Sequence, residues 1–76
     1  MNQERRQEID EITGELVGCW TRVDNIFEAE SAALEQLPTF RSGSSLDRKM
    51  QATLEQLEDA KQAIQSAINL LLEASE

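Results

Sequence analysis

Two long runs of apolar residues at seven-residue spacing, separated by one break, constrain the fold of this chain more than any other feature. The break is the segment 38–44, which contains Pro38 and Gly43. Apolar positions that recur in steps of three and four are typical of packed α-helices, whereas strict alternation is typical of strands. The sequence therefore predicts an all-α protein made of two coiled-coil-like helices.

Both arms follow the same rhythm. The apolar positions are Ile9, Ile12, Leu16, Cys19, Val23, Ile26, Ala33 and Leu37 in the first arm, and Met50, Leu57, Ala60, Ile64, Ala67, Leu71 and Ala74 in the second. Pro38 ends the first helix, because its ring disfavours helical geometry at the residue before it and removes an amide donor. Ser44 or Ser45 can cap the second helix, and Ser44 with Asp47 resembles a capping box.

We expect one domain over residues 1–76, with helices at about 3–37 and 45–74 and a turn at 38–44. A connection this short forces the helices to be antiparallel neighbours. If Leu37 faces Leu46, the apolar positions pair in regular layers. The predicted layers are Ile9 with Ala74, Ile12 with Leu71, Leu16 with Ala67, Cys19 with Ile64, Val23 with Ala60, Ile26 with Leu57, Glu30 with Thr53, and Ala33 with Met50.

Glu30 and Thr53 form the polar layer of this arrangement. The two polar residues fall opposite each other only in this register. They therefore favour it over a register shifted by a whole heptad, which a uniformly apolar repeat would allow equally well. We interpret the pair as a register-setting core layer whose carboxylate reaches water. A catalytic site is the alternative, but a Glu–Thr pair without His or a second carboxylate is poor catalytic material.

Several large apolar side chains fall outside these layers, on one flank of the predicted hairpin. They are Trp20, Phe27 and Leu34 in the first arm, and Leu54 and Ile68 in the second. At ~1.5–3 kcal/mol each, leaving them in water would forgo on the order of 10 kcal/mol, comparable with the ~5–15 kcal/mol that stabilises a typical domain. We therefore expect this flank to be an interface. A second copy would cover it in a homodimeric four-helix bundle, and another protein is the alternative.

Trp20, near the middle of this flank, and several residues close to it have expected roles. Trp20 is the expected anchor of the interface, since Trp is enriched among residues that dominate binding energy. Lys61 falls close to it and lays its stem over the ring. Cys19 is expected to be a small buried hydrophobe, and Gly14 and Gly18 mark either a softened helix segment or the close approach of another helix.

The chain carries seven Lys and Arg against fifteen Asp and Glu, a net charge of −8. This balance disfavours nucleic acid and anionic membranes as partners, because phosphate binding depends on Lys and Arg. An acidic stripe runs along the first helix at steps of three and four. Its residues are Glu4, Glu8, Glu11 and Glu15. The stripe is interpreted as a solvated face, or alternatively as an imitation of a phosphate backbone.

The chain lacks the residues that most catalytic and cofactor-binding sites require. The chain has no His and one Cys, so no zinc constellation is expected, and no Gly-rich phosphate loop follows a strand. We therefore expect no enzyme activity and no cofactor. We expect a cytoplasmic protein, because the chain has a lone cysteine and an N-terminus without an apolar leader. We expect no membrane span, because no run approaches ~20 apolar residues.

Several segments carry a resemblance to a known group. They are Glu4-Arg5-Arg6, the stretch from Glu28-Ala29-Glu30 to Leu37-Pro38, the serines before Met50, and the run from Leu57-Glu58-Asp59-Ala60 to Leu72-Glu73-Ala74. In these the chain resembles short acidic helical-hairpin proteins of bacteria and their phages. The resemblance implies a hairpin fold and a phage or prophage origin. It implies no activity.

The sequence thus predicts a small non-enzymatic protein–protein interaction module that self-associates through its apolar flank, as a phage or prophage accessory protein would. Two alternatives stay open. The first is an acidic nucleic-acid mimic that inhibits a host nuclease or DNA-binding protein. The second is a co-chaperone for another helical protein.

Overall fold

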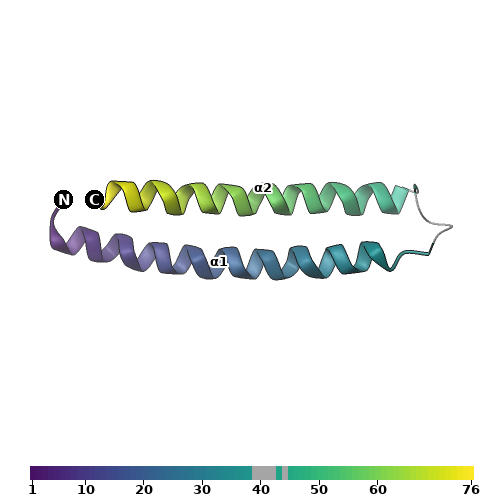
Figure 1. The fold of residues 1–76 in the computed structure, drawn as a ribbon, viewed down its shortest axis with the longest axis horizontal. Helices are drawn as coiled ribbons and strands as arrows, with labels where there is room; N and C mark the ends of the chain where they lie inside the picture. The colour runs from purple at the N-terminus through teal and green to yellow at the C-terminus, as the bar shows by residue number, and fades with distance from the viewer. Residues whose placement is uncertain (39–42, 44) are drawn as a thin grey trace.

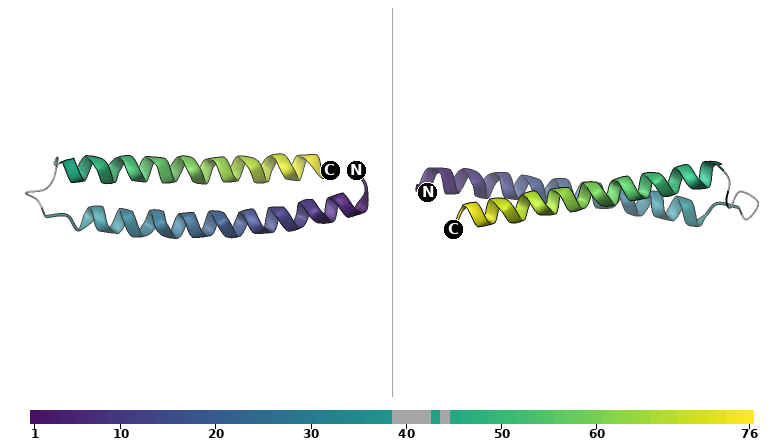
Figure 2. Two further views of the ribbon diagram at one scale, coloured as in Figure 1. Left: turned by 180° about the vertical axis from the view of Figure 1, so that it is seen from behind. Right: turned by 90° about the horizontal axis from the view of Figure 1, so that it is seen from above.

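The computed structural model describes residues 1–38, 43 and 45–76, which form two helices lying side by side (Figure 1). Helix α1 spans Gln3–Glu35 and helix α2 spans Ser45–Ala74. The helices run antiparallel and cross at a shallow angle, and both chain termini lie at the same end (Figure 2). The predicted all-α hairpin is confirmed.

Local hydrogen bonds define the helix ends. Asn2 caps α1 by accepting a hydrogen bond on its Oδ1 from the Arg5 amide at 2.9 Å. Helix α1 ends at Glu35, two residues before the predicted end. The Leu37 amide donates to the Leu34 carbonyl at 3.2 Å in a tighter last turn. This early end fits the restriction that Pro38 places on the residue before it.

Asp47 organises the start of α2. Its Oδ2 accepts a hydrogen bond from the Gly43 amide at 2.7 Å, one residue before the Ser44 amide that a capping box would use. Gly43 has φ +79°, a conformation that favours glycine. Ser44, the predicted hydroxyl partner in that box, lies outside the described residues.

The contact between the helices is a seam of half-buried side chains that recur in steps of three and four. From the first arm they are Ile9, Thr13, Leu16, Trp20, Val23, Phe27, Glu30, Leu34 and Leu37. From the second they are Asp47, Met50, Leu54, Leu57, Lys61, Ile64, Ile68, Leu71 and Ser75. Ile68 alone among the described residues is classed as buried, with 6% of its surface exposed.

This seam differs from the predicted layers. Ile12, Ile26 and Leu46, which were expected in the core, are 39%, 53% and 40% exposed. Cys19 is also exposed, so its prediction as a buried hydrophobe is wrong. Compared with the predicted arrangement, each helix is rotated about its own axis. Each helix has apolar residues at three positions per heptad, and one of these three rows faces outward.

The rotation buries the larger side chains at the expense of the smaller ones. The expected exposed flank of Trp20, Phe27, Leu34, Leu54 and Ile68 is not observed, because these residues lie in the seam. The residues of the predicted layers that are exposed instead are Ile12, Cys19, Ile26, Ala33, Leu46, Ala60 and Ala74. Since the gain from burial rises with apolar area, this orientation stabilises the pair more than the predicted one.

The hairpin remains thin. Its accessible surface is 5673 Å² for an 8.6 kDa chain. A compact monomer of that mass exposes about 4,700 Å², so this fold leaves roughly 1,000 Å² more in contact with water.

Candidate interaction surfaces

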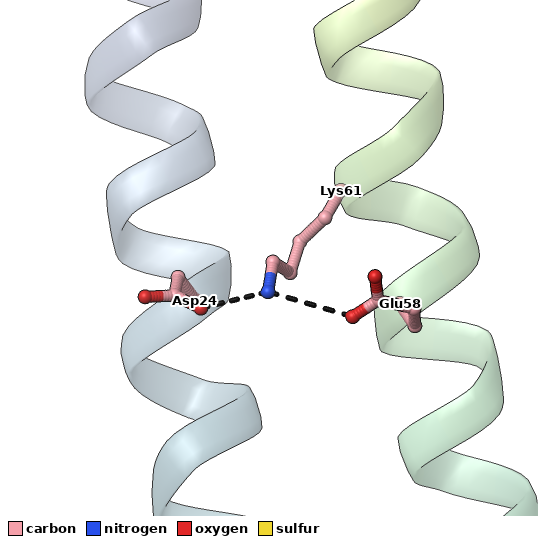
Figure 3. A network of polar contacts seen from close by, with 3 residues as sticks. All are labelled: Asp24, Glu58 and Lys61. Carbon is pink, nitrogen blue, oxygen red and sulfur yellow. Dashed lines mark hydrogen bonds and ion pairs between the residues drawn. The ribbon is translucent and has the colours of Figure 1, made fainter.

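Lys61 lies at the centre of a polar cluster that links the two helices midway along the seam (Figure 3). Its Nζ is 2.8 Å from Oδ1 of Asp24 on α1 and 3.5 Å from Oε2 of Glu58 on α2. Only 12% of the Lys61 side chain is exposed, against 30% for Asp24. The ion pair therefore joins a nearly covered cation to a partly hydrated carboxylate.

Two aromatic rings complete the surroundings of Lys61. Its Nζ lies 5.0 Å from the centroid of the Trp20 ring and 4.7 Å from that of Phe27. Both distances fall within the ~6 Å range of cation–π attraction. The predicted contact between Lys61 and Trp20 is confirmed, and the second ring was not anticipated.

The hydrogen bond to Asp24 raises the pKa of Lys61 above its ordinary value of 10.5. Burial of the amine opposes this shift, and the nearby charges of Asp24 and Glu58 support it. The cluster thus holds Lys61 in its charged form. Asp24 and Glu58 make the middle of this side of the hairpin polar, whereas Val17 and Leu72 on the same side are 50% and 47% exposed.

The opposite side of the seam carries an uncharged surface, which we call the apolar flank. It consists of Ile12, Cys19, Ile26 and Ala33 from the first helix, and Leu46, Ala60, Ala67 and Ala74 from the second. Each residue directly precedes a seam residue of its own helix. In an antiparallel pair, equivalent positions of both helices lie on the same side, so the two rows form one surface.

The position of Lys61 gives the register between these rows. Since Lys61 contacts Trp20, Asp24 and Phe27, it lies level with the residues around Asp24. The helices are antiparallel, so residues that follow Asp24 on α1 lie level with residues that precede Lys61 on α2, and the reverse. On this basis three pairs of flank residues lie at nearly the same height along the hairpin, within about two residues or ~3 Å. They are Ile26 with Ala60, Cys19 with Ala67, and Ile12 with Ala74.

A shallow hollow opens at the middle of the apolar flank. It has a volume of about 220 Å³ and is lined by Cys19, Arg22, Val23 and Ile26. Val23 is a seam residue, so the hollow reaches from the flank toward the contact between the helices. The sequence analysis missed this surface by assigning Cys19 and Ile26 to the core. The small size of Ala60, which is exposed, was the signal that could have placed this row outside; Ala67 is half-buried.

The predicted polar layer is only partly assembled. Glu30 and Thr53 are both half-buried, but Glu30 belongs to the seam while Thr53 lies in the row of the apolar flank, between Leu46 and Ala60. The Thr53 hydroxyl donates to its own helix, to the Lys49 carbonyl at 3.0 Å. A second seam residue, Thr13, has a buried hydroxyl without a hydrogen-bond partner among the described residues.

The acidic stripe is exposed along its whole length, with Glu4, Glu8, Glu11 and Glu15 all open to solvent. Of the two glycines of α1, Gly14 lies within this stretch and Gly18 lies one turn after it. A Cβ added at Gly14 or at Gly18 would meet nothing within 4 Å, so neither contacts α2 closely.

Within the described residues, no helix is long and apolar enough to cross a membrane. In the same part of the chain, no three His, Cys, Asp or Glu side chains gather as metal ligands. The chain matches no protein-family model, no curated protein and no solved structure.

Proposed function

We propose that the protein is a non-enzymatic interaction module that self-associates through the apolar flank. The flank, formed around Ile12, Cys19 and Ile26 on α1, is the single observation that carries the proposal. These side chains and the Ala row beside them make an uncharged strip along a protein of net charge −8. Large exposed apolar strips on small proteins are typical of interaction sites.

The large accessible surface of the thin hairpin supports the burial of this strip against a partner. Its excess surface of roughly 1,000 Å² exceeds the ~800 Å² that each partner of a standard stable interface buries. Covering the flank would place Val23 and its neighbours inside a core shared by four helices. The sequence-based interface around Trp20 and Phe27 is replaced in this proposal by the neighbouring row of Cys19 and Ile26, because Trp20 and Phe27 lie in the seam.

A matched pair of substitutions tests the proposal. Ile26 on the apolar flank is 53% exposed and Val17 on the far side of α1 is 50% exposed. Ile26→Glu should weaken the dimer Kd on the order of 100-fold or more, because each of two copies loses ~1.5–3 kcal/mol of apolar burial. Val17→Glu adds the same charge and should leave self-association unchanged. Sedimentation equilibrium at micromolar concentration gives both values.

Three results would overturn the proposal. A wild-type chain that is monomeric and fully helical at these concentrations excludes self-association. Equal dissociation by Ile26→Glu and Val17→Glu would point to charge rather than to the flank. Dissociation by Val17→Glu alone would place the interface on the other side.

The acidic stripe carries a second candidate function, an imitation of nucleic acid that occupies a basic groove. The exposure of Glu8, Glu11 and Glu15 favours it, since these carboxylates are available to a partner. Replacing all three by Gln should then abolish salt-sensitive capture of a basic protein. Binding that survives the change would exclude mimicry through this stripe.

A further inference from the structure

We infer that two copies of the hairpin pack with their two-fold axis parallel to the helices, so that α1 of each copy lies on α2 of the other. This inference rests on the proposed self-association and adds the arrangement of the copies. It places both hairpin tips at one end of the dimer and all four termini at the other. The occupant of the apolar flank is thus a second copy in one defined orientation.

The sizes of the flank residues carry the inference. A two-fold axis parallel to the helices keeps every residue at its own level along the rod. Ile26 of one copy then meets Ala60 of the partner subunit, and Cys19 meets Ala67 of the partner subunit. Each larger side chain faces a smaller one, as interdigitated packing at native density requires.

The same rule continues toward the termini. Ile12 lies at the level of Ala74, so this large residue also faces a small one across the interface. At every contact between copies, the helices are antiparallel neighbours. All four helices then form an up-and-down bundle with evenly spaced axes.

A two-fold axis perpendicular to the helices fits less well. It would set α1 against α1 and α2 against α2. Ile12, Cys19 and Ile26 would meet residues of the same row on one side, while Ala60 and Ala67 would meet Ala on the other. The first pair of helices would be held apart while the second pair came close, and the interface could not pack evenly along both rows.

The area of the flank suits a second copy. Two paired helices about 45 Å long, in a molecule 15 Å wide, offer roughly 700 Å² per copy. The total of about 1,400 Å² falls within the ~1,200–2,000 Å² of stable interfaces. The eight flank residues carry no charge, and the one charged residue that lines the hollow beside them is Arg22.

Disulfide trapping between two different chains tests the arrangement. One chain is the native sequence, whose single thiol is Cys19. The other carries Cys19→Ala with Ala67→Cys and a tag that changes its size. The chains are mixed, allowed to exchange and oxidised, and the products are separated without reductant. Neither chain has two thiols, so every disulfide joins two copies.

The expected main product is the mixed dimer, because its two thiols face each other across the interface. The native chain alone should remain reduced. Its two Cys19 residues lie on diagonal helices, roughly 11–14 Å apart for neighbouring axes at ~8–10 Å. Residues whose Cα atoms are more than ~7 Å apart cannot be bridged without backbone movement.

Efficient cross-linking of the native chain through Cys19, without the mixed product, would overturn the arrangement and favour the perpendicular axis. A dimer in sedimentation that forms neither disulfide would also overturn it, by showing that another face is used. Both results leave self-association itself intact. A chain that sediments as a monomer would instead defeat the proposed function.

Discussion

The Lys61 Nζ lies 2.8 Å from Asp24 Oδ1, so a single ion pair bridges the two helices near the middle of the seam. The pair places charge at the middle of one side of the hairpin, across the seam from the apolar flank. It also fixes the level of α2 against α1, because Lys61 is held between two rings of the opposite helix. A cation in the seam therefore acts as a marker of register.

The stem and the charge of Lys61 should have separable effects. Lys61→Met keeps an unbranched side chain over Trp20 and Phe27, so the variant should fold and leave the emission wavelength of Trp20 unchanged. Lys61→Ala removes the cover of both rings and should shift this emission to longer wavelength and lower the melting temperature. Equal spectra for the two variants would show that the stem does not shield Trp20.

The stability of the hairpin should fall at alkaline pH through Lys61. Its pKa is raised in the folded state, so the folded protein binds this proton more tightly than the unfolded chain. The resulting stabilisation is complete below the unfolded value of 10.5 and is lost as pH rises through the folded pKa. Thermal melts between pH 9 and about 12 measure the loss.

Lys49, the other lysine of the chain, provides the control for this pH dependence. Lys49→Met should melt with the same pH profile as the wild type, since Lys49 is exposed. Lys61→Met should show a flatter profile. Identical profiles for both variants would mean that another group titrates.

Gly14→Ala and Gly18→Ala should each stabilise the protein by about 0.5–1 kcal/mol, because Ala lowers the entropy cost of the helix. The added Cβ has open space at both positions. Denaturant unfolding measures the gain. Gly43→Ala is the contrasting control and should destabilise, since its φ of +79° strains any side chain. Destabilisation by Gly14→Ala or Gly18→Ala would indicate that another helix approaches α1 closely there.

Thr13→Val should also stabilise the hairpin, by about 1 kcal/mol, because it removes a buried hydroxyl that lacks a partner and keeps the branched shape. Thr21→Val is the control. The Thr21 hydroxyl is exposed and donates to the Val17 carbonyl at 3.1 Å, so its loss should not stabilise. A loss of stability in Thr13→Val, measured by thermal melting, would reveal a partner for the hydroxyl.

Neutralising the acidic stripe should raise stability at low salt. Replacing Glu8, Glu11 and Glu15 by Gln removes the like-charge pairs along α1, each worth ~0.2–0.5 kcal/mol. The gain should shrink in 1 M salt, where the Debye length is about 3 Å. In the dimer arrangement inferred above, both stripes lie at the same end. The variant should therefore also self-associate more tightly at low salt, and an unchanged Kd would contradict that arrangement.

The hairpin was predictable from the sequence because its determinants are local. The three-four rhythm gives the helices, and Pro38 ends the first arm within two residues of the expected position. The contact of Lys61 with Trp20 was also predictable, since rotating the helices changes the level of a residue along the rod very little.

The choice of seam was not predictable from the rhythm alone. Each helix has apolar residues at three positions per heptad, and two helices can bury only two of these rows. A pattern of steps treats Ala60 and Trp20 as equivalent, although burying the indole removes far more apolar surface from water. Side-chain size decided which row stayed outside, and with it the location of the candidate interface.

The two termini lie next to each other at one pole of the rod (Figure 1). Tension applied between them would therefore peel α1 from α2 instead of sliding one helix along the other. Each seam layer would bear the load alone and open in turn, beginning beside Ile9. A hairpin held by its ends is thus mechanically compliant, whatever free energy its layers contribute together.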